Sequence, residues 1–177
     1  NQPTFDVPTE MHRILGVDLT AIPGLSAQAV LTFFCEVGPQ ITRFPSSKHF
    51  ASWLGLCPDN RISGGKILSS KTRNVRCRLA NALRMAATTL YRSHSALGDY
   101  FRRLRARLGS PAAITAAAHK LARILFAMLR DRRSFDPQLL GTLNEKHLRR
   151  RQNSLRKFAA SLGFELVPTQ NLVHSVS

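Results

Sequence analysis

The chain has 177 residues, 44% of them hydrophobic, which is enough for one domain, or a small domain with an appendage, that buries a substantial core. This composition excludes wholesale disorder. A net charge of +16, from 26 basic and 10 acidic residues, instead points to a polyanionic partner. No apolar run approaches about 20 residues and no signal peptide opens the chain, so we expect no membrane partner.

Charge is unevenly distributed along the chain. Residues 1–60 carry three basic and five acidic side chains, whereas residues 61–157 carry 23 basic and four acidic ones. This onset predicts that binding to a polyanion begins near residue 61, and nucleic acid is the leading choice. A solvated, arginine-rich surface of a high-GC genome is the alternative.

The N-terminal residues contain one helix-start pattern. Residues 1–19 show no clear period and are interpreted as a linker, and a chain that opens on Asn1 without a methionine is expected to be a piece of a longer protein. Ser26 is a natural N-cap and Gly38 a natural stop for a helix over 27–37, with Ala27, Val30, Leu31 and Phe34 on one face.

The loop before that helix matches half of a helix-hairpin-helix element, whose backbone N–H groups face a phosphate. Pro23, Gly24 and Leu25 are therefore candidate nucleic-acid contacts. A plain helix-start loop explains the same residues equally well.

A second short helix is expected over 47–54, with Phe50, Trp53 and Leu54 facing inward. Trp53 could stack on a base, although a single tryptophan at helical spacing is more often part of the core. The pair Gly64-Gly65 then predicts the two-residue tip of a β-hairpin. Ser63, directly before that tip, is the candidate catalytic residue.

Amphipathic helices are expected over 74–92 and 97–108, from the start signal Ser110-Pro111 onward, and over 144–162. The residues therefore predict a mostly α fold, with a compact helical domain over 20–137, one short β-hairpin carrying the serine, and a basic helix and tail over 138–177. The first of these helices is expected to have a core face and an adjoining basic stripe of Arg73, Arg76 and Arg84. The core face comprises Val75, Leu79, Leu83, Ala86 and Leu90. The candidate nucleic-acid contacts around and after the hairpin are Arg61, Gly64, Gly65, Lys66, Lys71, Arg73, Arg76 and Arg84.

No metal site or catalytic motif is evident in the sequence. The three cysteines, Cys35, Cys57 and Cys77, lack zinc-ligand spacing, and their odd number favours a reducing, cytoplasmic setting. The acids form no cluster suited to Mg²⁺, and no base stands near Ser63 to activate it. From the residues alone a structural turn serine is favoured, in a basic helical nucleic-acid-binding domain.

Six motifs in one order over Leu15–Arg133 nevertheless resemble a known family. They are Ile22-Pro23-Gly24-Leu25-Ser26, Phe44-Pro45-Ser46, Trp53-Leu54-Gly55-Leu56-Cys57-Pro58, Ile62-Ser63-Gly64-Gly65-Lys66, and the later pair Leu83-Arg84-Met85-Ala86-Ala87 and Ile114-Thr115-Ala116-Ala117-Ala118-His119-Lys120-Leu121-Ala122. They are similar to the C-terminal transposase domain of the bridge-RNA-guided, DEDD-type insertion-sequence transposases (the IS-one-ten family).

This resemblance implies a bacterial DNA transposase in which Ser63 attacks a DNA phosphodiester and becomes covalently joined to it. It also implies a RuvC-like domain outside this chain that supplies four acids and Mg²⁺, a structured guide RNA, and a homo-oligomer (dimer or tetramer). The chain by itself is then expected to bind double-stranded DNA without cleaving it. A non-catalytic helix-hairpin-helix module and an RNA-binding or ribosome-like structural protein remain as alternatives.

Overall fold

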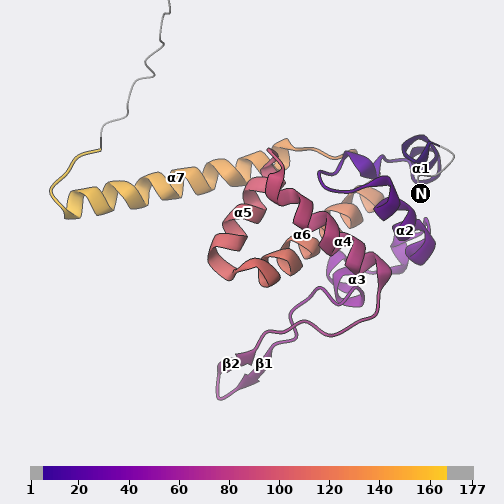
Figure 1. Ribbon diagram of the computed structural model, residues 1–177, viewed down its shortest axis with the longest axis horizontal. Helices are drawn as coiled ribbons and strands as arrows, with labels where there is room; N and C mark the ends of the chain where they lie inside the picture. Colours follow the sequence, from indigo (N-terminus) through magenta and orange to yellow (C-terminus); the bar gives the residue numbers. More distant parts are fainter. Residues whose placement is uncertain (1–5, 167–177) are drawn as a thin grey trace, which may run out of the picture. The chain divides into compact units, whose positions relative to one another are not determined.

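The computed structural model describes residues 6–166, apart from the side chains of residues 67 and 139–147. It is mostly helical, with one two-stranded antiparallel sheet (Figure 1). The chain divides into two compact units, residues 1–137 and 138–177. In the first unit the elements are α1 (Val7–Leu15), α2 (Ala27–Val37), α3 (Ser47–Trp53), β1 (Arg61–Ser63), β2 (Lys66–Ser69), α4 (Arg78–Thr89), α5 (Ala96–Leu108) and α6 (Ser110–Asp131), with the 3-10 turns η1 (Leu19–Ala21), η2 (Ile41–Arg43) and η3 (Leu90–Arg92).

Helix α6 is the centre of the first unit and packs against α3, α4 and α5, while α4 also packs against α2. Its buried side chains recur at three- and four-residue intervals, as Ala118, Leu121, Leu125 and Met128 illustrate. On its own length and composition α6 could cross a membrane, but half of its most apolar stretch is buried inside the protein. Packing in the core therefore accounts for its apolar character.

Helix α1 corrects the expectation of a linker over residues 1–19. Asp6 precedes the helix, a proline occupies its first turn, and Gly16 ends it with a φ of 73°. Val7, Met11 and Leu15 lie four residues apart and are buried, so this face belongs to the core. Packing against α2 supplies the stability that nine residues alone would lack.

Helix α2 begins and ends where its capping residues predict, and the Ser26 hydroxyl accepts a hydrogen bond of 3.2 Å from the Ala29 N–H. Its buried face is rotated from the expected one. Phe33 is fully buried whereas Phe34 is only partly so, because α1 and α4 contact adjacent sides of the helix. Trp53 also departs from expectation: 40% of it is exposed.

Helix α4 begins at Arg78, four residues later than expected, with Cys77 as its N-cap. Leu79, Leu83 and Ala86 of the expected core face are buried, whereas Val75 precedes the helix and is 37% exposed. Arg73 and Arg76 therefore lie on an extended segment, and the expected helical stripe with Arg84 does not exist. Helix α6 likewise has Gly109, rather than Ser110, at its N-cap position.

The second unit contains α7 (Gln138–Ser161), which starts six residues before the expected 144. Its described side chains, from residue 148 on, are almost all exposed. Residues 167–177, most of which were expected as a tail, lie outside the described residues.

Candidate nucleic-acid interface

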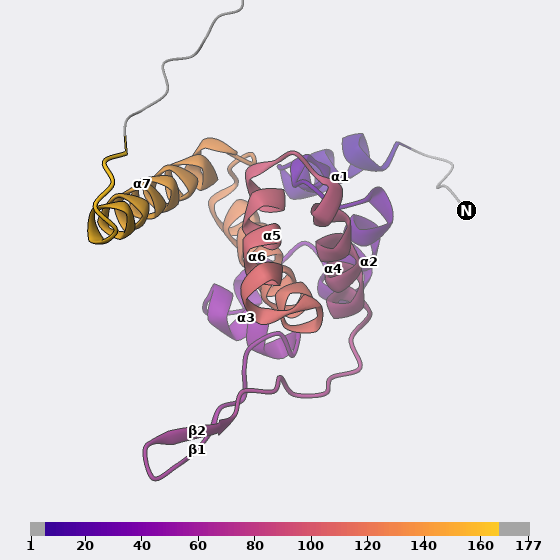
Figure 2. The same ribbon diagram turned by 60° about the vertical axis from the view of Figure 1, so that its left-hand side comes forward.

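The hairpin β1–β2 extends away from the helices of the first unit (Figure 2). Ser63 ends β1 and pairs with Lys66, which begins β2. The connecting Gly64 and Gly65 have φ values of 55° and 76°, as a two-residue type I′ turn requires. The isolated bridge between Pro58 and Thr72 closes the base of the hairpin, so the tip is presented at the end of a short paired arm.

Ser63 lies on an exposed, cationic face of this hairpin. Paired residues share a face, so Lys66 lies on the same side as Ser63. Arg61 begins the same strand, but the register of the hairpin is irregular between Arg61 and Ile62. All three residues are exposed, and so is Ile62, at 63%. The arrangement can therefore bring a hydroxyl and the Lys66 ammonium to one phosphate, with Arg61 two residues away.

Among the described residues, the Ser63 hydroxyl has no hydrogen-bonded side-chain partner, and no group of three or more His, Cys, Asp or Glu side chains comes together.

Three adjoining cavities follow the extended segment between the hairpin and α4. Their volumes are about 440, 600 and 270 Å³. The first two share Thr72, Arg73 and Asn74, and the last two share Val75, Arg76 and Cys77. We call this continuous surface the arginine groove. Its basic lining residues are Arg61, Lys71, Arg73, Arg76, Arg78 and Arg84.

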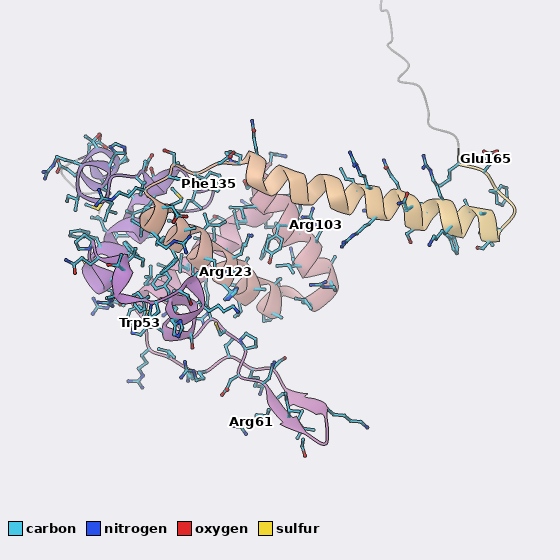
Figure 3. All side chains as sticks on the ribbon, turned by 180° about the vertical axis from the view of Figure 1, so that it is seen from behind. Trp53, Arg61, Arg103, Arg123, Phe135 and Glu165 are labelled. Carbon is cyan, nitrogen blue, oxygen red and sulfur yellow. The ribbon has the colours of Figure 1, made fainter. Side chains whose placement is uncertain are left out.

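The groove brings together five of the six basic residues that the sequence singled out near the hairpin. Lys66 lines none of the three cavities. Arg61 lines the groove from the hairpin and Trp53 lines it from α3, whereas Arg123 of α6 lines none of the three cavities (Figure 3). The residues converge because the segment 70–77 runs extended past the start of α4 instead of forming its first turn.

The Arg73 side chain is fixed by helix α3. Its guanidinium donates to the Ser52 carbonyl at 3.0 Å and to the Ser52 hydroxyl at 2.9 Å. Two donors of the five-donor guanidinium are used in this way, and the others remain available for an anion. Arg73 therefore both anchors the extended segment and contributes charge.

Glu36 of α2 holds the start of α4. Its carboxylate accepts hydrogen bonds from the N–H of Arg78 at 3.0 Å and of Leu79 at 2.9 Å, and from the Cys77 thiol at 3.2 Å. Burial raises the pKa of the Cys77 thiol, which keeps the proton that this bond needs. Glu36 thus fixes the position of Cys77, and Arg76 and Arg78 lie on either side of it in the chain.

The pKa of Glu36 is lowered from its ordinary value of 4.5. Partial burial raises it, but the hydrogen bonds from Leu79, Cys77 and Arg78 and the positive charge of Arg78 together outweigh burial. The carboxylate is therefore ionised at neutral pH and occupies the positive end of α4. The N–H groups of Arg78 and Leu79 at this helix end are therefore already occupied by Glu36.

The loop Ile22–Leu25 is partly accessible, with Gly24 exposed, and its contact with a phosphate stays a prediction. Leu25 is only 7% exposed, and its N–H donates to the Ile22 carbonyl at 3.0 Å. A Cβ on Gly24 would lie 2.8 Å from the Ala86 carbonyl oxygen, so this loop is packed against α4. Pro23 is partly exposed. The loop positions α4, and only parts of it face solvent.

Two members of this surface, Glu36 and Arg78, are not identified from sequence, and Trp53 is named there as a possible stacking residue but interpreted as core. Arg78 has a local signal, since it follows Arg73 and Arg76 in one basic run. Glu36 meets its partners across 41 to 43 residues of chain, and no spacing rule finds such a pair.

The fold and the groove define a basic, helical domain that presents an exposed serine on a hairpin. Residues 18–102 match the family model described as "Transposase IS116/IS110/IS902 family". The chain is also 34% identical over 127 residues to "Insertion element IS110 uncharacterized 43.6 kDa protein" from Streptomyces coelicolor. The aligned region covers 69% of this chain and 30% of that relative.

The chain therefore belongs to the IS110 family of transposases. It spans less than a third of the length of the relative it matches. No solved structure matches it significantly.

Proposed function

We propose that this chain is the serine-bearing part of a DNA transposase, and that Ser63 is the nucleophile for strand cleavage and rejoining. The single observation that carries this proposal is the exposed Ser63 at a glycine-tipped hairpin, paired with Lys66 and two residues after Arg61. Membership of a transposase family supports the class of reaction.

The proposed step exchanges one ester for another. The Ser63 oxygen bonds to a DNA phosphorus, the hydroxyl proton passes to a base, and one bridging deoxyribose oxygen leaves and is protonated. Attack by a deoxyribose hydroxyl on the phosphoserine reverses these changes and rejoins a strand. Arg61 and Lys66 stabilise the negative charge that the non-bridging phosphoryl oxygens carry in the transition state, because fixed cations aimed at such charge contribute strongly to the rate.

The base and the Mg²⁺ are proposed to belong to a RuvC-like region outside these 177 residues. The described residues do not fit a Mg²⁺ ion, because no three metal-ligating side chains converge among them. We accordingly expect the 177-residue chain to bind DNA and not to cleave it.

The partners that we propose are double-stranded DNA, a structured guide RNA and further copies of the whole protein. The charge of +16 and the arginine groove support a nucleic-acid partner in general. RNA binding and self-assembly are inferred from the family resemblance. The loop Ile22–Leu25 is proposed to add a helix-hairpin-helix contact through Pro23 and Gly24, which face solvent.

Replacing Ser63 by alanine in the full-length transposase with its guide RNA tests the proposal. We expect cleavage to fall by at least about 1000-fold and the covalent protein–DNA adduct to disappear, with DNA affinity unchanged. Ser69→Ala is the matched control, because Ser69 is a second serine of the same hairpin and pairs with Arg61. Cleavage retained by Ser63→Ala rejects the assignment.

A non-catalytic nucleic-acid-binding module is the second candidate, and the lack of a base or metal ligands beside Ser63 among the described residues favours it. This function predicts salt-dependent DNA binding by the full-length protein without any adduct. An adduct from the unaltered protein eliminates it.

A further inference from the structure

We propose that the arginine groove holds an unpaired nucleic-acid strand and that one base of this strand stacks on Trp53 at the end of the groove. The inference rests on the proposed function and specifies which form of nucleic acid this surface takes. Its test measures binding alone, so its failure is distinct from failure of the Ser63 chemistry.

The groove has a large excess of uncompensated positive charge. Its six basic residues face two acids, Asp59 and Glu36. Glu36 is already occupied by three donors from the start of α4. Within the described residues none of the six cations forms an ion pair. A row of such cations along one segment suits the regularly spaced phosphates of a single strand.

Trp53 supplies an aromatic surface at the end of this row. It lines the same cavity as Arg76 and is 40% exposed, although Phe50 behind it is fully buried and stacks on it at 6.4 Å between ring centroids. The exposed Arg43 guanidinium lies over the Trp53 ring, 5.4 Å from its centroid, so a base that stacks on this part of the ring displaces that side chain. The indole is therefore held in place from within while part of it stays accessible, as a stacking platform requires.

The chemistry of Trp53 favours an unpaired strand over a duplex. Bases inside a duplex already stack on their neighbours, so only an unpaired base can present its face to Trp53.

Trp53 also provides the measurement, because it is the only tryptophan in the sequence. We would titrate the 177-residue chain with an oligothymidylate of about 12 nucleotides, the matching oligouridylate, and a duplex of the same length. We expect both single strands to quench the Trp53 emission and the duplex to leave it unchanged. The oligothymidylate and oligouridylate results separate a DNA strand from an RNA strand as the preferred occupant.

Two pairs of variants separate stacking and charge from fold. Binding is measured by the anisotropy of a labelled oligothymidylate. Trp53→Leu should weaken binding about 5- to 150-fold because it removes the aromatic ring, whereas Trp53→Phe keeps a ring and should retain most of the affinity. Both variants keep an apolar side chain packed on Phe50, so they are matched for the fold. Arg76→Gln should lower the slope of log K against log salt by about 0.7, and Arg92→Gln, a surface arginine of η3 that lines none of the three cavities, should not. Equal affinities for Trp53→Leu and Trp53→Phe, or equal quenching by the duplex, overturn the proposal.

Discussion

Removing the Glu36 carboxylate should weaken the junction between α2 and α4. Glu36→Ala leaves the N–H groups of Arg78 and Leu79 and the Cys77 thiol without their acceptor. Losing a helix cap costs about 0.5–2 kcal/mol, and the interaction of a carboxylate with the helix dipole adds about 0.3–1 kcal/mol. Because Glu36 is only partly buried and water can replace some bonds, we expect about 1–2 kcal/mol in the free energy of unfolding.

Thermal and urea denaturation at pH 7 would measure this loss, which corresponds to a fall in Tm of about 2–8 °C for a domain of this size. Glu10→Ala is the control. Glu10 bonds to Arg13 at 3.0 Å on the surface, and its removal should change stability by less than about 0.5 kcal/mol.

The effect of Glu36 should also depend on pH in a fixed direction. Since the folded pKa lies below the ordinary 4.5, the unfolded chain binds the proton first as the pH falls. The stabilisation is therefore complete above about pH 4.5 and is lost as the pH drops through the lower folded pKa. A difference between wild type and Glu36→Ala that persists at pH 2, or none at pH 7, would refute this reasoning.

Two further predictions concern α5 and α6. Gly98→Ala should cost about 2–4 kcal/mol, because its Cβ would lie 2.1 Å from the Ser93 carbonyl oxygen; Gly109→Ala, with a φ of 79° but no atom within 4 Å, should cost about 1 kcal/mol, and equal melting points would contradict the clash. Burial, with the charges of Arg123 and Lys120, lowers the pKa of His119 from its ordinary 6.5, so the unfolded chain binds that proton more readily. The free energy of unfolding should accordingly fall between about pH 7 and 5, and His119→Gln should flatten this slope; an unchanged slope shows that His119 does not cause it.

Local rules were sufficient for much of the fold. Ser26 and Gly38 placed both ends of α2, and the Gly64-Gly65 pair placed the turn that carries Ser63. These predictions work because capping and tight turns depend on φ, ψ and hydrogen bonds within a few residues. The family resemblance was likewise visible in short motifs.

Other features escaped local reasoning because distant parts of the chain decide them. Helix α1 was missed, although its buried residues recur every four positions, because a short helix is stable only against a partner such as α2. The start of α4 was placed four residues early because the segment 74–77 has acceptable helical periodicity. Glu36, bonding to the Arg78 and Leu79 N–H groups, fixes the start instead.

By itself the sequence determined that the chain is helical and basic and that it presents a serine beside a glycine turn, since composition, periodicity and capping act over short distances. Only the tertiary structure decided that Arg73, Arg76 and Arg84 share one groove with Trp53 at its end, and that Glu36 closes the end of α4. The physical reason is that these contacts join residues from different helices, and their geometry exists only after α2, α3 and α4 have packed together.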